Sequence, residues 1–173
     1  MHMLHLLRHA KSSWKEDVDD HERPLNRRGR EAARLLARHL PAAVGRLDLV
    51  LCSTAQRARE TLDLALAELT PRPHAAIEPE LYLADETRLI ECLRRLPEEA
   101  ESVLVVGHNP GLHELAVTLA APQSRDFGQL AGGKFPTGTL ASFRVEVPWA
   151  KLDRGCHRLV GYLTPESLGG GAG

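Results

Sequence analysis

The stretch LLRHAKSSW, residues 6–14, continues a short apolar run and ends that run on a cation and an imidazole. Residues 3–8 predict a buried strand, because their leucines form an apolar segment too short for a helix. Arg8 closes this strand and His9 follows it directly, where an uncharged turn would be ordinary. The meaning of this ending depends on how the other predicted strands end.

Further strands and helices alternate along the chain. Strands are predicted at residues 3–8, 47–53, 75–77, 102–108, 139–147 and 157–165. Helices are predicted from Asn26 to near Pro41, from Ser53 or Thr54 to about Leu69, from Asp85 to Leu96 and from Pro110 to about Ala120. This alternation favours an α/β fold of three α/β/α layers with a mostly parallel central sheet, to which the last two strands add an antiparallel edge.

Length and composition describe an ordinary globular domain. The chain has 173 residues, of which 43% are hydrophobic and 26% charged, and its net charge is -1. We expect one domain over residues 1–168, with a long loop at 121–138 and a flexible Gly-rich tail at 169–173.

Composition also sets expectations for location and partners. The balanced charge gives no reason to expect nucleic acid as a partner, and no apolar run is long enough to span a membrane. The N-terminus lacks a signal-peptide pattern. Cys52, Cys92 and Cys156 are scattered without CxxC spacing, which is typical of a reducing compartment. We therefore expect a cytoplasmic protein, which we take to be a monomer.

Two other strands end much as the first one does. The strand at 47–53 is followed by CSTAQRARET, which places Arg57 about one turn into the next helix, and the strand at 102–108 ends on His108. Ligands of open α/β sheets bind at the carboxyl ends of the strands, where helix N-termini also point. Arg8, His9, Arg57 and His108 can therefore converge on one pocket, and two guanidiniums with two imidazoles suit a phosphoryl group.

Each of these residues alone would more simply be a surface or loop residue, so the prediction depends on their joint occurrence. Nine histidines also raise the question of a metal site. No acidic ligand set accompanies His9 and His108, and HExxH spacing is absent. We therefore expect neither a metal nor a cofactor.

Four motifs carry a family resemblance: RHAKSSW, ERPLNRRG, CSTAQRARET and VVGHNPGLHEL. Together they resemble the histidine phosphatase superfamily, with its phosphoglycerate mutase-like fold, and within it the short SixA-type phosphohistidine phosphatases. The resemblance covers residues 3–120 and extends more loosely to Leu163. One departure is Ala10, which stands where the family signature has Gly after Arg-His.

The resemblance implies a role for each converging residue. His9 would be the nucleophile that is transiently phosphorylated, Arg8 and Arg57 would hold the phosphoryl oxygens, and His108 would stabilise their charge. Physical chemistry agrees with these roles. An imidazole attacks phosphorus only through an unprotonated nitrogen, and neighbouring guanidiniums favour the neutral ring while they stabilise the transferring group.

The general acid of many relatives has no clear counterpart. The region IEPELYLADE lacks the usual Glu-Gly pair, which leaves Glu80 and Asp20 as candidates, although each is more simply a surface carboxylate. A missing acid favours an N–P bond, since an imidazole leaves phosphorus more readily than an alkoxide does.

The short span between Arg57 and His108 leaves no room for a lid domain, so we expect a shallow, open pocket. Such a pocket can admit a side chain of another protein. The leading hypothesis is a phosphatase that acts on phosphohistidine of a phosphotransfer protein. The alternatives are a small-molecule phosphomonoesterase, which would take a small phosphate ester, and a phosphate-binding module without turnover.

Overall fold

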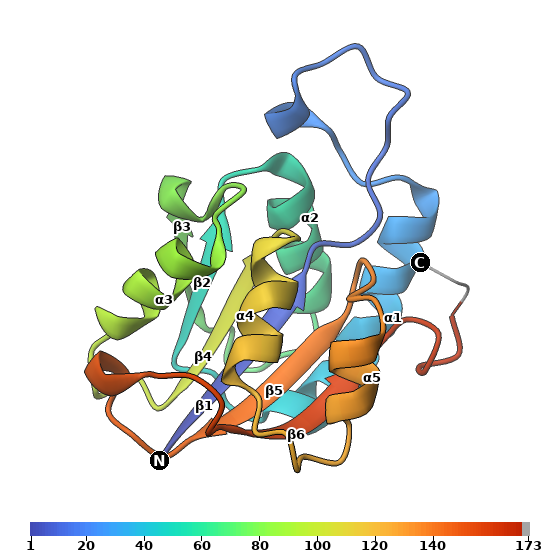
Figure 1. The fold of residues 1–173 in the computed structure, drawn as a ribbon. Coiled ribbons are helices and arrows are strands. Elements are labelled where there is room, and N and C mark those ends of the chain that lie inside the picture. The colour runs from blue at the N-terminus through green and yellow to red at the C-terminus, as the bar shows by residue number, and fades with distance from the viewer. Residues whose placement is uncertain (171–173) are drawn as a thin grey trace.

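The computed structural model describes residues 1–170, which form a six-stranded sheet between two layers of helices (Figure 1). The strands are β1 (His2–Arg8), β2 (Leu49–Ser53), β3 (His74–Glu78), β4 (Ser102–Gly107), β5 (Leu140–Val145) and β6 (Arg158–Leu163). The helices are α1 (Arg27–Val44), α2 (Gln56–Ala65), α3 (Glu86–Arg94), α4 (Gly111–Leu119) and α5 (Phe127–Gly132). Short 3-10 turns lie at Asp20–Glu22, Pro79–Leu81 and Trp149–Lys151.

The order of strands across the sheet is β3-β2-β4-β1-β5-β6. Strands β1 to β4 are parallel, β5 runs antiparallel to β1, and β6 runs antiparallel to β5. The predicted α/β fold, with its mostly parallel sheet and antiparallel edge, is therefore confirmed.

Side-chain alternation along the central strands builds one hydrophobic core on each face of the sheet. Val103 and Val105 of β4 pack with residues of α3 and α4, whereas Leu104 and Val106 pack with residues of α1 and α2. All four are essentially inaccessible to solvent. A strand buried on both faces is a continuous apolar run, which is why this segment is so clear in the sequence.

The first helix differs from its prediction at one end. Asn26 caps α1 as expected, because its Oδ1 accepts a hydrogen bond from the Gly29 N–H at 2.9 Å. The helix does not stop near Pro41 but continues to Val44, since the buried face that includes Leu40 extends to Val44. It ends at Gly45, whose positive φ of 60° a residue with a side chain rarely adopts.

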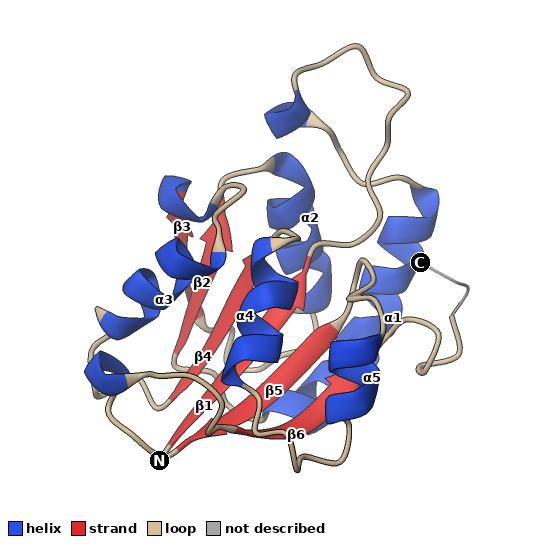
Figure 2. Ribbon diagram, viewed as in Figure 1, coloured by secondary structure: helices blue, strands red, loops and turns tan. Residues whose placement is uncertain are grey.

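Two other predictions on helices were wrong. Helix α2 begins after Ala55 and ends at Ala65, so neither Ser53 nor Thr54 is its N-cap and it stops short of Leu69. The segment 121–138, predicted as a long loop, contains the short helix α5 (Figure 2). Six residues are too few to produce a helical repeat in the sequence, and α5 is fixed instead by the burial of Leu130.

The carboxyl ends of β2, β4 and β1 meet at one edge of the sheet. Arg8 pairs with Gly107 across β1 and β4, and Cys52 pairs with Val106 across β2 and β4. Because β5 is antiparallel, its amino end arrives at the same edge and brings the preceding segment 133–139 with it.

The first turn of α1 is also pressed against this edge. A Cβ on Gly29 would lie 2.0 Å from the backbone oxygen of Lys11, so only glycine allows this approach.

The Gly-rich tail predicted at residues 169–173 is described only in part. Residues 171–173 lie outside the described residues, whereas Gly170 donates its N–H to the Pro165 carbonyl at 2.8 Å. Among residues 1–170, no helix combines the length and the apolar character needed to cross a bilayer.

Candidate active site

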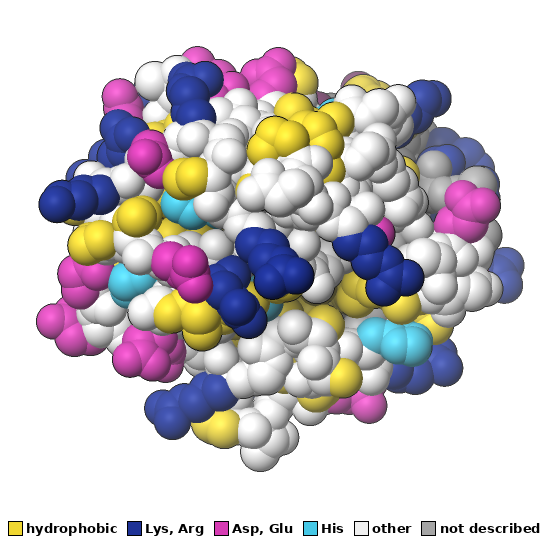
Figure 3. All heavy atoms as spheres, turned by 60° about the horizontal axis from the view of Figure 1, so that its bottom comes forward, with side chains coloured by type: hydrophobic (Ala, Val, Ile, Leu, Met, Phe, Trp, Pro, Cys, Tyr) yellow, Lys and Arg dark blue, Asp and Glu magenta, His cyan; other side chains and the backbone are white. Residues whose placement is uncertain are grey.

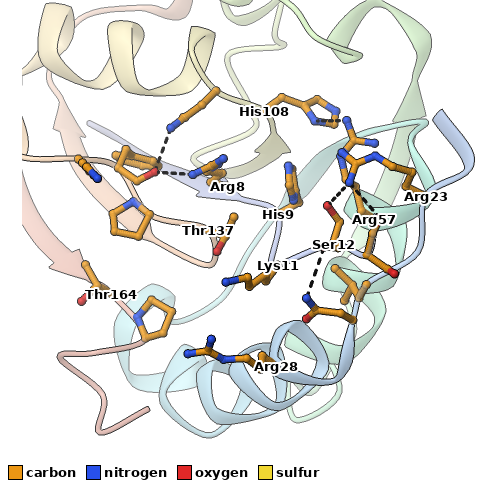
Figure 4. Close-up of a pocket in the computed structure, with 18 of the residues that line it drawn as sticks. Arg8, His9, Lys11, Ser12, Arg23, Arg28, Arg57, His108, Thr137 and Thr164 are labelled. Carbon is orange, nitrogen blue, oxygen red and sulfur yellow. Dashed lines mark hydrogen bonds between the residues drawn. The ribbon is translucent and has the colours of Figure 1, made fainter. Parts of the chain in front are cut away.

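A cleft of about 1530 Å³ opens at the carboxyl edge of the sheet, and all four predicted site residues line it (Figure 4). Arg8 and His9 come from the end of β1, Arg57 from the first turn of α2, and His108 from the end of β4. The structure therefore brings together the residues that the strand ends predicted.

The His9 ring is held with one nitrogen free. Its Nδ1 lies 2.7 Å from the carbonyl oxygen of Ala10, which can only accept, so Nδ1 carries the proton and Nε2 keeps its lone pair. The Thr61 hydroxyl fixes this turn, accepting from the Ala10 N–H at 2.9 Å. Burial, followed by the positive charges of the site, lowers the pKa of His9 to about 3. His9 is therefore a neutral imidazole with an available Nε2.

His108 is held through both of its ring nitrogens. Its Nδ1 lies 3.5 Å from Nη2 of Arg57, a donor, so Nε2 carries the proton and donates to Ser53 Oγ at 2.7 Å. The centroids of the His9 and His108 rings are 5.2 Å apart. Burial, followed by the charge of Arg57, lowers the pKa of His108 to about 3. This second imidazole is neutral and fixed rather than free to attack.

The two guanidiniums carry the positive charge of the site. Nη1 of Arg8 donates to the carbonyl of Phe135 at 3.0 Å, and burial, with Arg57 as the second cause, lowers the pKa of Arg8. Among the described residues, the Nε atoms of Arg8 and Arg57 are buried without a hydrogen-bond partner. Buried donors without partners are costly, which favours an anion in the cleft.

Asp20 is an ion-pair partner of Arg57 and not a plain surface carboxylate. Its carboxylate accepts from Arg57 Nη2 at 3.1 Å, from Arg23 Nε at 3.1 Å and from the Tyr82 hydroxyl. The Tyr82 bond and then the two arginines lower the pKa of Asp20 to about 2. A carboxyl that is ionised at neutral pH is a poor general acid, so the geometry makes Asp20 a group that orients Arg57.

Glu80, the other acid candidate, lies outside the cleft. Its carboxylate accepts from Arg95 Nη2 at 2.7 and 2.9 Å, in a separate small hollow beside Cys92 and Leu96. Hydrogen bonding from Cys92 and Arg95 lowers the pKa of Glu80. The structure therefore does not bring Glu80 to the phosphoryl site.

Several residues that shape the site were missed from the sequence. Ser53 orients His108, Thr61 fixes the turn after His9, and Tyr82 and Arg23 hold Asp20. Arg23 stands in the motif ERPLNRRG, but its burial, which sets it apart from a surface arginine, is seen only in the structure. Ser53, Thr61 and Tyr82 are not marked in the sequence, because a hydroxyl side chain has many ordinary roles.

A group of metal-ligand type lies elsewhere in the described part of the chain. Asp153, Cys156 and His157 have ligand atoms within 4.8 Å of one another, in the turn before β6. None of the three lines the cleft that holds His9, and neither His9 nor His108 belongs to the group. The group was not predicted, because its residues match neither CxxC nor HExxH spacing.

The fold and the site define a class of protein. An open α/β sheet with a free imidazole nitrogen, a second fixed imidazole and two guanidiniums has what phosphoryl transfer to a histidine requires. The family model of the histidine phosphatase superfamily (branch 1) matches residues 4–82. The chain belongs to this superfamily, and its fold is the predicted phosphoglycerate mutase-like one.

Relatives and solved structures resemble nearly the whole chain. An uncharacterized protein of Mycobacterium tuberculosis is 38% identical over 161 residues, which cover 92% of this chain and 99% of that protein. A SixA structure from Nakamurella multipartitia has a TM-score of 0.82 at 29% identity, covering 95% of this chain and 96% of that one. The protein histidine phosphatase SixA complexed with tungstate has a TM-score of 0.77 at 25% identity, covering 96% and 99%.

Proposed function

We propose that this phosphatase hydrolyses phosphohistidine on a phosphotransfer protein, through a phosphorylated His9. The observation that carries the proposal is the hydrogen bond from His9 Nδ1–H to the Ala10 carbonyl, which leaves Nε2 of this cleft residue with its lone pair and supports His9 as the nucleophile. The likeness to the protein histidine phosphatase SixA supports the choice of substrate.

Two displacements at phosphorus account for the reaction. In the first, His9 Nε2 forms a bond to phosphorus while the substrate's N–P bond breaks, and the released imidazole nitrogen takes a proton from solvent. In the second, water attacks phosphorus, the bond to His9 breaks, and inorganic phosphate leaves. Arg8 and Arg57 neutralise the phosphoryl oxygens in both steps, while the fixed His108 ring stabilises the same charge.

The carboxylates of the cleft favour an N–P bond. Among the described residues that line the cleft, only Glu16, Asp20 and Glu166 carry carboxyl groups. Hydrogen bonds lower the pKa of both Asp20 and Glu16, so neither holds a proton at neutral pH. An alkoxide leaving group needs such a proton, whereas the imidazole of phosphohistidine can leave without it.

The open cleft supports a protein as the substrate. Exposed residues such as Trp14, Lys15, Arg27 and Lys134 line it, so a side chain displayed on another protein can reach His9. We propose that neither a metal nor a cofactor takes part, since arginines supply the positive charge. Cytoplasmic location and a monomeric state remain predictions.

Turnover of a substrate panel tests the proposal. A phosphohistidine-bearing phosphotransfer domain and free phosphohistidine should be hydrolysed with kcat/KM at least about 100-fold above sugar phosphates and p-nitrophenyl phosphate, with or without EDTA. Arg57→Ala should lose all but about 0.1% of this activity.

Faster turnover of the esters would instead identify a small-molecule phosphomonoesterase. Phosphate binding with no turnover of any substrate would identify a binding module. Loss of activity with EDTA, restored by a divalent ion, would contradict the metal-free mechanism.

A further inference from the structure

The cleft concentrates positive charge in a chain whose total charge is nearly zero. Nine of the 22 lysines and arginines line it, against three of the 23 aspartates and glutamates. The cleft therefore carries six net positive charges, and the rest of the chain carries seven net negative charges. By contrast, charges of both signs are interspersed on the face in Figure 3, which lies toward the amino ends of the parallel strands. Such an asymmetry attracts an anionic partner to the cleft.

This charge exceeds what one phosphoryl group requires. Arg8 and Arg57 already serve the phosphoryl site, and Arg23 is engaged by Asp20. The ammonium groups of Lys11 and Lys134 make no hydrogen bond or ion pair with any residue in 1–170. These two cations remain available to a further anionic group.

The cationic side chains extend the site away from His9. Figure 4 shows Lys11 and Arg28 reaching into the cleft beyond His9, from the loop after β1 and from the first turn of α1. Lys134 lines the cleft from the segment that precedes β5. The volume of about 1530 Å³ is also above the roughly 300–1,000 Å³ of a typical small-molecule site.

Two exposed apolar side chains line the same cleft. Trp14 is 79% exposed and Leu83 is 56% exposed. The Trp14 ring lies over the Arg23 guanidinium, 3.5 Å from ring centroid to Cζ, and Arg23 is itself buried and bonded to Ser12. A tryptophan that is exposed yet held by a fixed cation is typical of the anchors of protein interfaces.

We infer that this cleft docks a protein element in which acidic side chains flank the phosphohistidine. Lys11, Arg28 and Lys134 pair with the flanking carboxylates, while Trp14 and Leu83 take apolar contacts from the partner. This inference rests on the proposed function and adds the charge and size of its substrate. The residues that select the protein substrate are thus different from those that hold the phosphoryl oxygens.

Matched phosphopeptides test the inference. One peptide carries phosphohistidine between two glutamates on each side, the other has glutamines at those positions, and free phosphohistidine is the reference substrate. The native protein should hydrolyse the glutamate peptide with a kcat/KM about 10-fold above that of the glutamine peptide. The preference should disappear near 1 M salt, where the screening length falls to about 3 Å.

Variants then test which residues produce the preference for the glutamate peptide. Lys11→Ala should reduce the preference for the glutamate peptide severalfold, whereas Lys151→Ala, an exposed lysine outside the cleft, should keep it. Trp14→Ala should lower the kcat/KM of the glutamate peptide relative to free phosphohistidine, and Val160→Ala, which is 44% exposed on β6, should not.

Two failures can be told apart. Equal kcat/KM for the two peptides in the native protein would overturn the docking inference and leave the proposed function standing. No hydrolysis of any phosphohistidine substrate, with an ester hydrolysed instead, would overturn both.

Discussion

The carboxyl ends of β1 and β4 are neighbours in the sheet, and each delivers a buried histidine to the cleft. The two imidazoles share a pKa of about 3, yet they are held in opposite ways. His9 is bonded through Nδ1 to the next residue's carbonyl, whereas His108 is bonded through Nε2 to Ser53 on β2 and through Nδ1 to Arg57.

The two rings differ in their hydrogen bonding and not in burial or pKa, and this difference determines which proposed role each ring can take. The ring at the end of β1 has one nitrogen without a partner, so it can form a bond to phosphorus. The ring at the end of β4 has both nitrogens engaged with groups that orient it, so it is suited to stabilise charge.

The largest expected effect concerns the site of phosphorylation. With labelled phosphohistidine as substrate and an alkaline quench, label should appear on the peptide that contains LLRHAK, at Nε2 of His9. His9→Ala should abolish the label, since it removes the ring nitrogen proposed to attack phosphorus.

His108→Ala is the matched comparison for this experiment. It should still be labelled, but both formation and breakdown of the phosphoenzyme should slow about 100-fold, because the lost charge stabilisation serves both steps. Label on His108, together with full activity of His9→Ala, would mean that the two roles are reversed.

A smaller effect is expected from Ser53, the residue that orients the second ring. Ser53→Ala leaves the buried Nε2–H of His108 without a partner and should lower kcat about 10-fold. Ser53→Thr keeps the hydroxyl and should restore much of this loss. Steady-state kinetics and denaturant unfolding of the same variants would measure both effects.

The chain contains its own control for this change. Ser142 Oγ and His5 Nδ1 form a second buried Ser–His hydrogen bond of 2.7 Å, which lies between β5 and β1 and outside the cleft. Ser142→Ala should therefore cost stability, about 1–3 kcal/mol as for other unpaired buried groups, without lowering kcat. An equal loss of kcat in both variants would make Ser53 a structural residue only.

Ser53 also shows where sequence analysis reaches its limit. The periodicity of apolar residues was enough to predict the sheet, because its central strands are buried on both faces. The ends of β1 and β4 were also marked, by Arg8-His9 and by His108. The same sequence suggested Ser53 as a helix cap, since a hydroxyl before a helix usually has that role. Its actual partner, His108, is 55 residues away and is set only by the pairing of β2 with β4.

Asp20 illustrates the same limit for charge. A carboxylate in the polar segment 11–26 looks like a solvated group, because nothing local identifies its partners. Arg57 and Tyr82 reach it from distant parts of the chain and make it an ion-pair partner with a lowered pKa. Residues that act through long-range pairs become recognisable only when the tertiary structure is known.

The smallest expected effect is on stability, and it follows from the lowered pKa that the two histidines share. Their pKa values of about 3 in the folded protein lie below the ordinary value of 6.5, so below pH 6.5 the unfolded chain binds more protons. Their contribution to stability is therefore complete above pH 6.5 and is lost as the pH falls toward 3. Each histidine should account for about 1 kcal/mol between pH 6.5 and 5.5.

Urea unfolding at pH 7.5, 6.5 and 5.5 measures this dependence. The free energy of unfolding should fall with pH in the native chain, and His9→Gln and His108→Gln should each flatten the fall by a similar amount. If only one of the two cleft variants changes the dependence of the unfolding free energy on pH, the two rings differ in protonation as well as in hydrogen bonding. Hydrogen bonding alone would then not explain the difference between the histidines of β1 and β4.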